Sequence, residues 1–171
     1  MAPPAPYILR PARVADIPRL PAIERAAAAL FVEAGIGGTI TVMPTEELEA
    51  ARLEGRLLVA ADADDQPVGF LVMAIIDGLA HLAEMDVHPA HGRRGLGSAL
   101  LEAGVDQARQ RGLPAMTLTT YAALPWNAPF YARRGFAVVP ASEWTPAMAA
   151  TAAHEGVTPD SGRVLMRRAL S

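Results

Sequence analysis

The chain has 171 residues, 51% of them hydrophobic, which is enough to bury the core of one compact domain but little for two. Its formal net charge of −3 argues against a nucleic-acid partner, and it contains no apolar run near the roughly 20 residues of a membrane-spanning helix. It has no cysteine, and its 15 Lys and Arg residues are all arginine, which excludes thiolate nucleophiles, disulfides and any mechanism that requires a lysine.

Strands and helices are expected throughout the first half of the chain. Apolar residues at helical spacing follow Asp16, an acid placed where the helix dipole favours one. The expected elements are a strand at 7–13, a helix at 14–34 ended by Gly35, Gly37 and Gly38, a short helix from Pro44 to about Gly55, and strands at 56–62 and 68–77.

The second half continues the alternation around one long helix. The expected elements are a strand at 79–87, a helix from Gly95 to near Gly112, a strand at 115–120, a short helix at 126–134 capped by Gly135, and strands at 136–139 and 164–168. The alanine-rich segment 141–161 is left without an assignment, as a candidate lid or subunit contact. This order predicts a mixed α/β sheet within a single domain over residues 1–171.

The opening segment MAPPAPYILRPAR is rich in proline. It lacks the basic region followed by an apolar region that a secretory signal has. We therefore expect a cytoplasmic protein without nucleic-acid or membrane partners.

The most informative segment is HPAHGRRGLGSALL, residues 88–101, between an expected strand and the long helix. Its glycines allow backbone N–H groups to converge, and the helix start adds unpaired N–H groups and a positive dipole end. Arg93 and Arg94 add charge in a geometry that suits phosphate oxygens. The segment therefore predicts a diphosphate site. A dinucleotide-binding turn is disfavoured, because Leu100 stands where G-x-G-x-x-G needs its third glycine.

This segment and its surroundings resemble the GNAT superfamily of acetyl-CoA-dependent N-acetyltransferases. The family pattern is a strand ending in Val-x-Pro, then Gln/Arg-x-x-Gly-x-Gly/Ala, and later Tyr-x-x-x-Gly-Phe. The corresponding residues are Val87-His88-Pro89, then Gly92-Arg93-Arg94-Gly95-Leu96-Gly97, and Tyr131 to Phe136. Gly92 departs from the pattern, so a side-chain contact from that position is missing.

The resemblance covers most of the chain and implies both a fold and an activity. The implied fold is a GNAT-like α/β domain whose mixed, mostly antiparallel sheet has about six or seven strands, flanking helices and a splay between the fourth and fifth strands. The implied activity is direct transfer of an acetyl group from acetyl-CoA to the amine of a small molecule or peptide in a ternary complex. The implied cofactor contacts are Met85, Val87, Gly92, Arg93, Arg94, Gly95, Leu96, Gly97, Ser98, Asn127 and Tyr131.

The resemblance also implies catalytic roles. Tyr131 corresponds to the general acid that protonates the departing thiolate, with a packed core aromatic as the alternative. A protonated amine must lose a proton to a base before it can react, and Glu84 is the candidate base. The alternatives for this role are Asp86, on the same strand face, and a chain of water molecules. Glu84 could instead have a structural role only, as the partner of an arginine. Asn127 could contact the cofactor or, as the favoured role, cap the short helix with Trp126 as a hydrophobic staple.

Two other function classes stay open. Asp86, His88 and His91 form D-x-H-x-x-H, a metal-ligand spacing that is disfavoured because Pro89 lies between the histidines and no helix aligns them. A coenzyme A-binding sensor without catalysis is the second alternative. The sequence does not identify the acceptor, although the acidic residues hint at a cationic amine, and a homodimer is an expectation because dimers are common among GNAT proteins.

Overall fold

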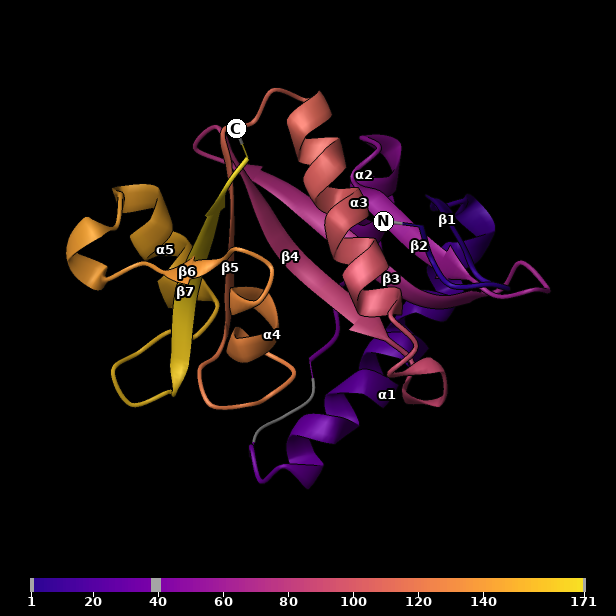
Figure 1. Ribbon diagram of the computed structural model, residues 1–171, viewed down its shortest axis with the longest axis horizontal. Helices are drawn as coiled ribbons and strands as arrows, with labels where there is room; N and C mark the ends of the chain where they lie inside the picture. The colour runs from indigo at the N-terminus through magenta and orange to yellow at the C-terminus, as the bar shows by residue number, and fades with distance from the viewer. Residues whose placement is uncertain (1, 38–40, 171) are drawn as a thin grey trace. The chain divides into compact units, whose positions relative to one another are not determined.

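The computed structural model describes residues 2–37 and 41–170 (Figure 1). The strands are β1 (Ile8–Pro11), β2 (Leu57–Ala61), β3 (Pro67–Ile76), β4 (Leu79–Val87), β5 (Ala115–Tyr121), β6 (Ala137–Val138) and β7 (Arg163–Ala169). The α-helices are α1 (Leu20–Glu33), α2 (Thr45–Leu53), α3 (Leu96–Gln110), α4 (Ala128–Ala132) and α5 (Pro146–His154), with 3-10 helices η1 (Val14–Arg19), η2 (Pro89–His91) and η3 (Ala141–Glu143). None of the helices in the described part of the chain is long and apolar enough to cross a membrane.

The strands form one mixed sheet in the order β1-β2-β3-β4-β5-β7-β6. The pairs β1/β2, β2/β3, β5/β7 and β6/β7 are antiparallel, whereas β4 and β5 pair in parallel, at Ala80 with Met116 and His81 with Thr117. The predicted fold class is therefore confirmed: the sheet is mixed, mostly antiparallel and flanked by helices. The splay expected beyond the β4/β5 pairing stays a prediction.

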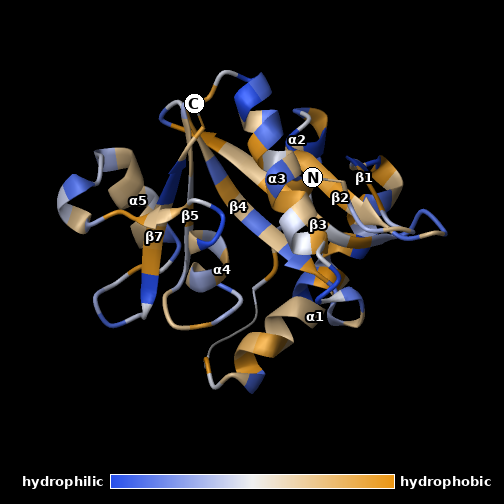
Figure 2. Ribbon diagram, viewed as in Figure 1, coloured by the Kyte–Doolittle hydropathy of each residue, from blue (hydrophilic) through white to orange (hydrophobic). Residues whose placement is uncertain are grey.

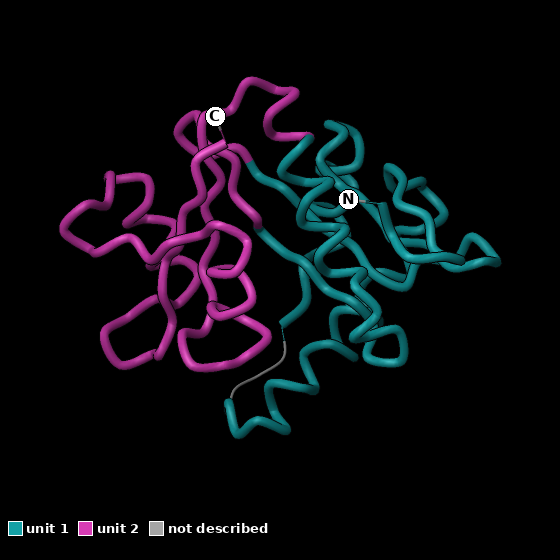
Figure 3. The backbone as a smooth tube through the Cα atoms, viewed as in Figure 1, with its two compact units in different colours: residues 1–74, 83–106 teal, residues 75–82, 107–171 magenta. Residues whose placement is uncertain are grey.

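The chain divides into two compact units, which Figure 3 colours separately. The first unit comprises Met1–Ala74 and Ala83–Asp106, and the second comprises Ile75–Leu82 and Gln107–Ser171. β3 and β4 each contribute some residues to the first unit and some to the second.

Apolar residues on both faces of β2 and β3 explain the core of the first unit, and Figure 2 shows these strands as mainly hydrophobic. On one face, residues of the strands pack with the apolar sides of η1, α1 and α2 in a single cluster: Ala12, Ile17, Leu20, Ile23, Leu48, Ala51, Leu57, Val59, Phe70 and Val72. Side chains alternate along a strand, so Leu71 points to the opposite face, where it lies against Gly104 of α3. The sheet of this unit is therefore covered by helices on both faces.

The second unit is built on a long antiparallel pairing of β5 with β7, from Ala115–Ala169 to Tyr121–Arg163. A separate apolar cluster joins α5 to this sheet through Val139, Met148, Ala152 and Leu165. Thr145 begins α5 by accepting a hydrogen bond from the Met148 N–H at 3.2 Å. The segment 141–161, to which the sequence assigned no element, therefore contains a helix that buries Met148 and Ala152.

Three predicted elements differ from the structure in extent. The helix expected at 14–34 is a 3-10 helix followed by α1, because Pro18 lies inside η1 and Pro21 at the start of α1, and neither has an N–H to donate. The helix expected at 126–134 is reduced to Ala128–Ala132, and the strand at 136–139 to Ala137–Val138. Gly35 follows α1 with φ +81, as expected of a glycine that ends a helix, whereas Gly38 lies outside the described residues.

Candidate functional site

The predicted diphosphate turn lies in the first unit, between β4 and α3 (Figure 1). The His88 N–H donates to the Val68 carbonyl at 2.8 Å, which fixes the end of β4, and η2 then leads to Gly92 in extended conformation. Arg93 has φ 57 and Gly95 has φ 83, both in the left-handed region. Backbone that alternates in this way typically turns successive N–H groups towards one side, a geometry that suits an anion.

The start of α3 adds to this anion site. The helix has 15 residues from Leu96, and the first intrahelical bond runs from the Ala99 N–H to the Gly95 carbonyl at 3.0 Å. The first N–H groups of an α-helix lie ahead of its i to i−4 ladder, and they carry the positive end of the helix dipole. The backbone of this turn therefore suits a diphosphate.

Tyr7, just before β1, holds the turn in place. Its hydroxyl lies 2.9 Å from His91 Nδ1 and accepts a hydrogen bond from Arg94 at 2.8 Å, while its side chain is buried. Arg94 also donates weakly to the Ala90 carbonyl at 3.4 Å. Arg94 is thus tied to the first unit, whereas Arg93 is exposed beside the anion site. Sequence reasoning missed Tyr7, since more than 80 residues separate it from both partners.

Three carboxyl groups gather in the first unit near the end of β4. Glu84 and Asp86 lie two residues apart on the strand, and Glu24 of α1 joins them, with one oxygen of each within 4.8 Å of the others. The predicted association of Glu84 with Asp86 on one strand face is therefore observed. Glu24 was not anticipated, because nothing in the spacing of α1 distinguishes it from a surface acid.

The electrostatics of this group are unusual. Burial raises the pKa of Asp86 well above its ordinary value, and the charges of Glu84 and Glu24 and a hydrogen bond with Glu84 raise it further. Burial also raises the pKa of Glu24, against the opposing effect of the Met43 N–H, which donates to both of its oxygens at 3.0 and 2.9 Å. A carboxyl group with a raised pKa keeps its proton at a pH where an ordinary aspartate has lost it, and a close pair of carboxyl groups titrates as one coupled unit.

Tyr131 lies in the second unit, on α4. Its ring makes edge contacts with Phe130 at 5.1 Å and with Phe136 at 5.8 Å between centroids, and its side chain is half-buried. The Phe136 N–H donates to the Tyr131 carbonyl at 3.2 Å, so the Tyr-x-x-x-Gly-Phe segment closes on itself as a compact turn. This packing fixes the ring and is compatible with both roles considered for Tyr131.

Asn127 occupies the N-cap position of α4, but its predicted side-chain cap is wrong. The side-chain amide instead donates to the Thr120 hydroxyl at 2.7 Å, and both side chains are buried. One reason is local, since Pro129 at the second helical position has no N–H for a cap to accept. The other is tertiary, because the Thr120 hydroxyl on β5 offers a buried partner.

The histidine spacing considered for a metal does not gather its ligands. His91 is hydrogen bonded to Tyr7, and His88 Nδ1 accepts from the Ala90 N–H at 3.2 Å. Among residues 2–37 and 41–170, the acidic and histidine side chains close enough to share an ion are Glu24, Glu84 and Asp86.

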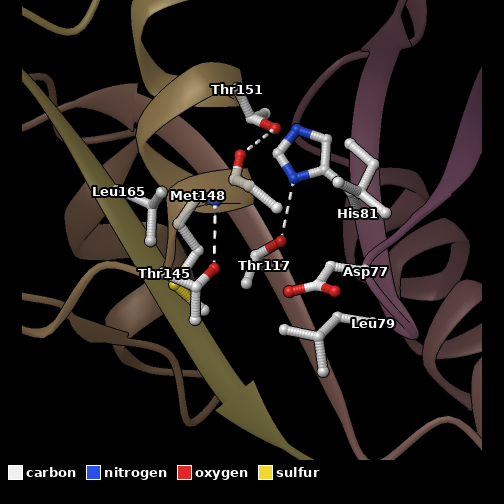
Figure 4. Close-up of a pocket in the computed structure, with 10 residues that line it drawn as sticks. Asp77, Leu79, His81, Thr117, Thr145, Met148, Thr151 and Leu165 are labelled. Carbon is white, nitrogen blue, oxygen red and sulfur yellow. Dashed lines mark hydrogen bonds between the residues drawn. The ribbon is translucent and has the colours of Figure 1, made fainter.

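A second polar network lies in the second unit, beside a small recess shown in Figure 4. His81 Nδ1 lies 2.9 Å from the Thr117 hydroxyl, and its Nε2 lies 2.9 Å from Glu155. Glu155 also accepts from the Thr119 hydroxyl at 2.6 Å, and Arg163 donates to the same hydroxyl at 2.9 Å. The chain from Thr117 through His81 to Glu155 therefore connects the sheet to the residue that follows α5.

We expect Glu155→Gln to lower the free energy of unfolding by about 1–3 kcal/mol at neutral pH, because His81 loses a charged partner. Burial alone would raise the pKa of Glu155, but the hydrogen bond and charge of His81, with Thr119 and Arg163, hold it below its ordinary value. A depressed pKa contributes stability above the unfolded-state value, and the contribution is lost as the pH falls through the folded-state value. Urea unfolding should therefore show the wild type and variant converging in acid. The control is Glu143→Gln, which changes an exposed acid in the same unit. A difference in the free energy of unfolding between wild type and Glu155→Gln that does not change with pH would contradict this prediction.

Comparison with known proteins identifies a family model that matches residues 26–136, more than half of the chain, and is described as the acetyltransferase (GNAT) family. Over 62 residues the chain is 44% identical to the mycothiol acetyltransferase of Clavibacter michiganensis subsp. michiganensis. That match covers 36% of this chain and 20% of the relative, so the chain spans about a fifth of that protein's length.

Solved structures with the same fold extend over nearly the whole chain. N-acetylglutamate synthase from Neisseria gonorrhoeae, complexed with coenzyme A and N-acetyl-glutamate, superposes with a TM-score of 0.73 at 19% identity, covering 98% of this chain and 36% of that one. The PaiA N-acetyltransferase from Thermoplasma acidophilum, in complex with coenzyme A, has a TM-score of 0.70 at 18% identity and coverages of 95% and 98%. At these identities the likeness shows the fold.

Proposed function

The chain belongs to the GNAT acetyltransferase family, and from that premise we propose that it transfers an acetyl group from acetyl-CoA directly to the amine of a small molecule or peptide. Acetyl-CoA is the cosubstrate of this family, and when bound it supplies an activated acetyl thioester. The observation that carries the proposal is the turn from Gly92 to Gly97, whose left-handed residues precede the start of α3.

The residues of this turn fit the diphosphate of coenzyme A. The N–H groups after Arg93 supply donors without needing side chains, which compensates for Gly92 at the position where the family usually has Gln or Arg. The exposed Arg93 supplies a charge that can reach the phosphates. Backbone groups of Met85 and Val87 would hold the pantetheine arm, with Ser98 and Asn127 as further contacts.

The remaining roles are those of proton acceptor and donor. The pair of Glu84 and Asp86 accepts the proton of the acceptor ammonium, so that the nitrogen can attack the thioester carbonyl carbon. As the C–N bond forms and the C–S bond breaks, the Tyr131 hydroxyl donates its proton to the departing thiolate, and the resulting phenolate takes up the second proton that the nitrogen loses as it becomes an amide. The close approach of the Glu84 and Asp86 carboxyl groups, the raised pKa of Asp86 and the fixed Tyr131 ring support these assignments.

Calorimetric titration of coenzyme A into the protein tests the cofactor site, and we expect a dissociation constant between roughly 1 μM and 1 mM. Gly95→Ala should weaken binding about fivefold, because the alanine lets the free turn relax out of the left-handed region and binding must restore that conformation at a cost of about 1 kcal/mol. The added Cβ itself meets no atom within 4 Å, so the effect is conformational.

The matched control is Gly112→Ala at the other end of α3, where φ is +70 and a Cβ likewise meets nothing within 4 Å. Both substitutions carry the same backbone penalty, but only the one at position 95 should change the affinity. Equal effects of the two substitutions, or wild-type protein that binds no coenzyme A, would refute the proposed site.

Thiol release from acetyl-CoA across a panel of amines separates an enzyme from a sensor that only binds coenzyme A. Tight binding without thiol release from any amine, including peptide amino termini, would favour the sensor. Our proposal also includes a single functional domain over residues 1–171, a cytoplasmic location and a homodimer, each of which stays a prediction.

A further inference from the structure

The three carboxyl groups of Glu24, Glu84 and Asp86, here called the acidic triad, come from two elements of the first unit. Figure 1 shows α1 beside the carboxyl-terminal end of β4, where the triad oxygens lie within 4.8 Å of one another. The charged groups that act most strongly on Asp86 are the other two members of the triad. Like charges held this close repel each other and favour a bound cation.

Two further observations indicate that the triad is built for a ligand. Asp86 Oδ2 is buried and has no hydrogen-bond partner among the described residues, so one acceptor of the triad is unused. Glu24 is buried and fixed by the Met43 N–H on both of its oxygens, so its carboxylate cannot turn away from the other two. An orphan acceptor beside a clamped carboxylate is a costly arrangement unless a donor fills it.

We infer that the acidic triad binds the ammonium group of the acceptor, and that it selects diamines or polyamines over amines that carry a carboxylate. This inference rests on the proposed acetyl transfer, since it names the substrate class of that same site. Three N–H donors of a primary ammonium match three carboxyl groups, including the orphan oxygen. A carboxylate on the acceptor would add a fourth negative group, which the triad repels.

A metal ion fits the triad less well than an ammonium. Magnesium and calcium require six or more oxygen ligands, and they bind carboxylates in the fully ionised form. Burial and the charges of Glu84 and Glu24 instead raise the pKa of Asp86, which favours a proton on the Glu84–Asp86 pair. An ammonium tolerates that protonated pair, because each carboxyl group keeps a lone pair to accept from it.

The test is calorimetric titration of 1,4-diaminobutane into protein saturated with coenzyme A, compared with 4-aminobutanoate, in which a carboxylate replaces one amine. We expect the diamine to bind at least fivefold more tightly than the amino acid. Glu24→Gln should weaken the diamine about fivefold and leave coenzyme A affinity unchanged. The control Glu33→Gln removes an exposed acid from the end of the same helix and should change neither affinity.

Each other outcome has a defined meaning. Coenzyme A binding without diamine binding, or equal affinity for the two amines, overturns the inference and leaves the proposed function intact. Failure to bind coenzyme A counts against the proposed function instead. Manganese binding that Glu24→Gln abolishes, with no diamine binding, would show a metal site. If Glu24→Gln does not fold, as judged by its thermal unfolding, Asp86→Asn provides the same comparison on the strand side.

Discussion

Glu84→Gln is expected to lower kcat/KM at least about hundredfold at neutral pH, which is within the usual contribution of a general base. The substitution removes the carboxyl group beside Asp86 that we propose as the proton acceptor of the acceptor ammonium. Coenzyme A affinity should change less than twofold, because the diphosphate turn lies outside this pair. Steady-state kinetics with a thiol readout and calorimetry measure the two effects separately.

The pH profile distinguishes this role from a structural one. Burial first, and then the charges of Glu84 and Glu24, raise the pKa of Asp86. Removing the Glu84 charge therefore lowers the pKa of Asp86, and the acid limb of the residual activity should move to lower pH. The control Glu46→Gln, at an exposed position of α2, should leave both kcat/KM and the acid limb of the pH profile unchanged. A Glu84→Gln enzyme with wild-type turnover would exclude Glu84 as the base.

Tyr131→Phe is expected to lower kcat at least tenfold while coenzyme A binds normally. The ring contacts with Phe130 and Phe136 need no hydroxyl, so these contacts should survive while proton donation to the thiolate is lost. The same thiol-release assay measures the loss. An acetyl thioester donor whose leaving thiol is less basic than that of coenzyme A should depend less on Tyr131.

The matched control for this variant is Tyr121→Phe, at the end of β5. The Tyr121 ring lies 4.7 Å beneath the Arg163 guanidinium, a contact that phenylalanine retains. We therefore expect turnover within about twofold of the wild type. Equal turnover in the Tyr131→Phe enzyme and the wild type would leave Tyr131 as a packed aromatic residue only.

Local sequence patterns predicted the features that depend on neighbouring residues. The glycine spacing before residue 96 indicated an anion-binding helix start, and the left-handed angles of Arg93 and Gly95 agree with it. The alternation of strands and helices predicted the class of the sheet, because the period of apolar residues reflects which faces are buried. Boundaries were less accurate where prolines, as in η1, broke an otherwise helical pattern.

Long-range contacts decided what local patterns could not. The Tyr7 hydroxyl contacts the turn at His91 and Arg94, and Glu24 reaches the β4 carboxylates from α1. Asn127 occupies a position typical of a helix cap, but its side-chain amide donates to the buried Thr120 hydroxyl instead. A sequence gives the order of donors and acceptors along the chain, whereas folding brings distant ones within hydrogen-bond range. Burial then makes it costly to leave a donor or acceptor without a partner, so these long-range pairs form.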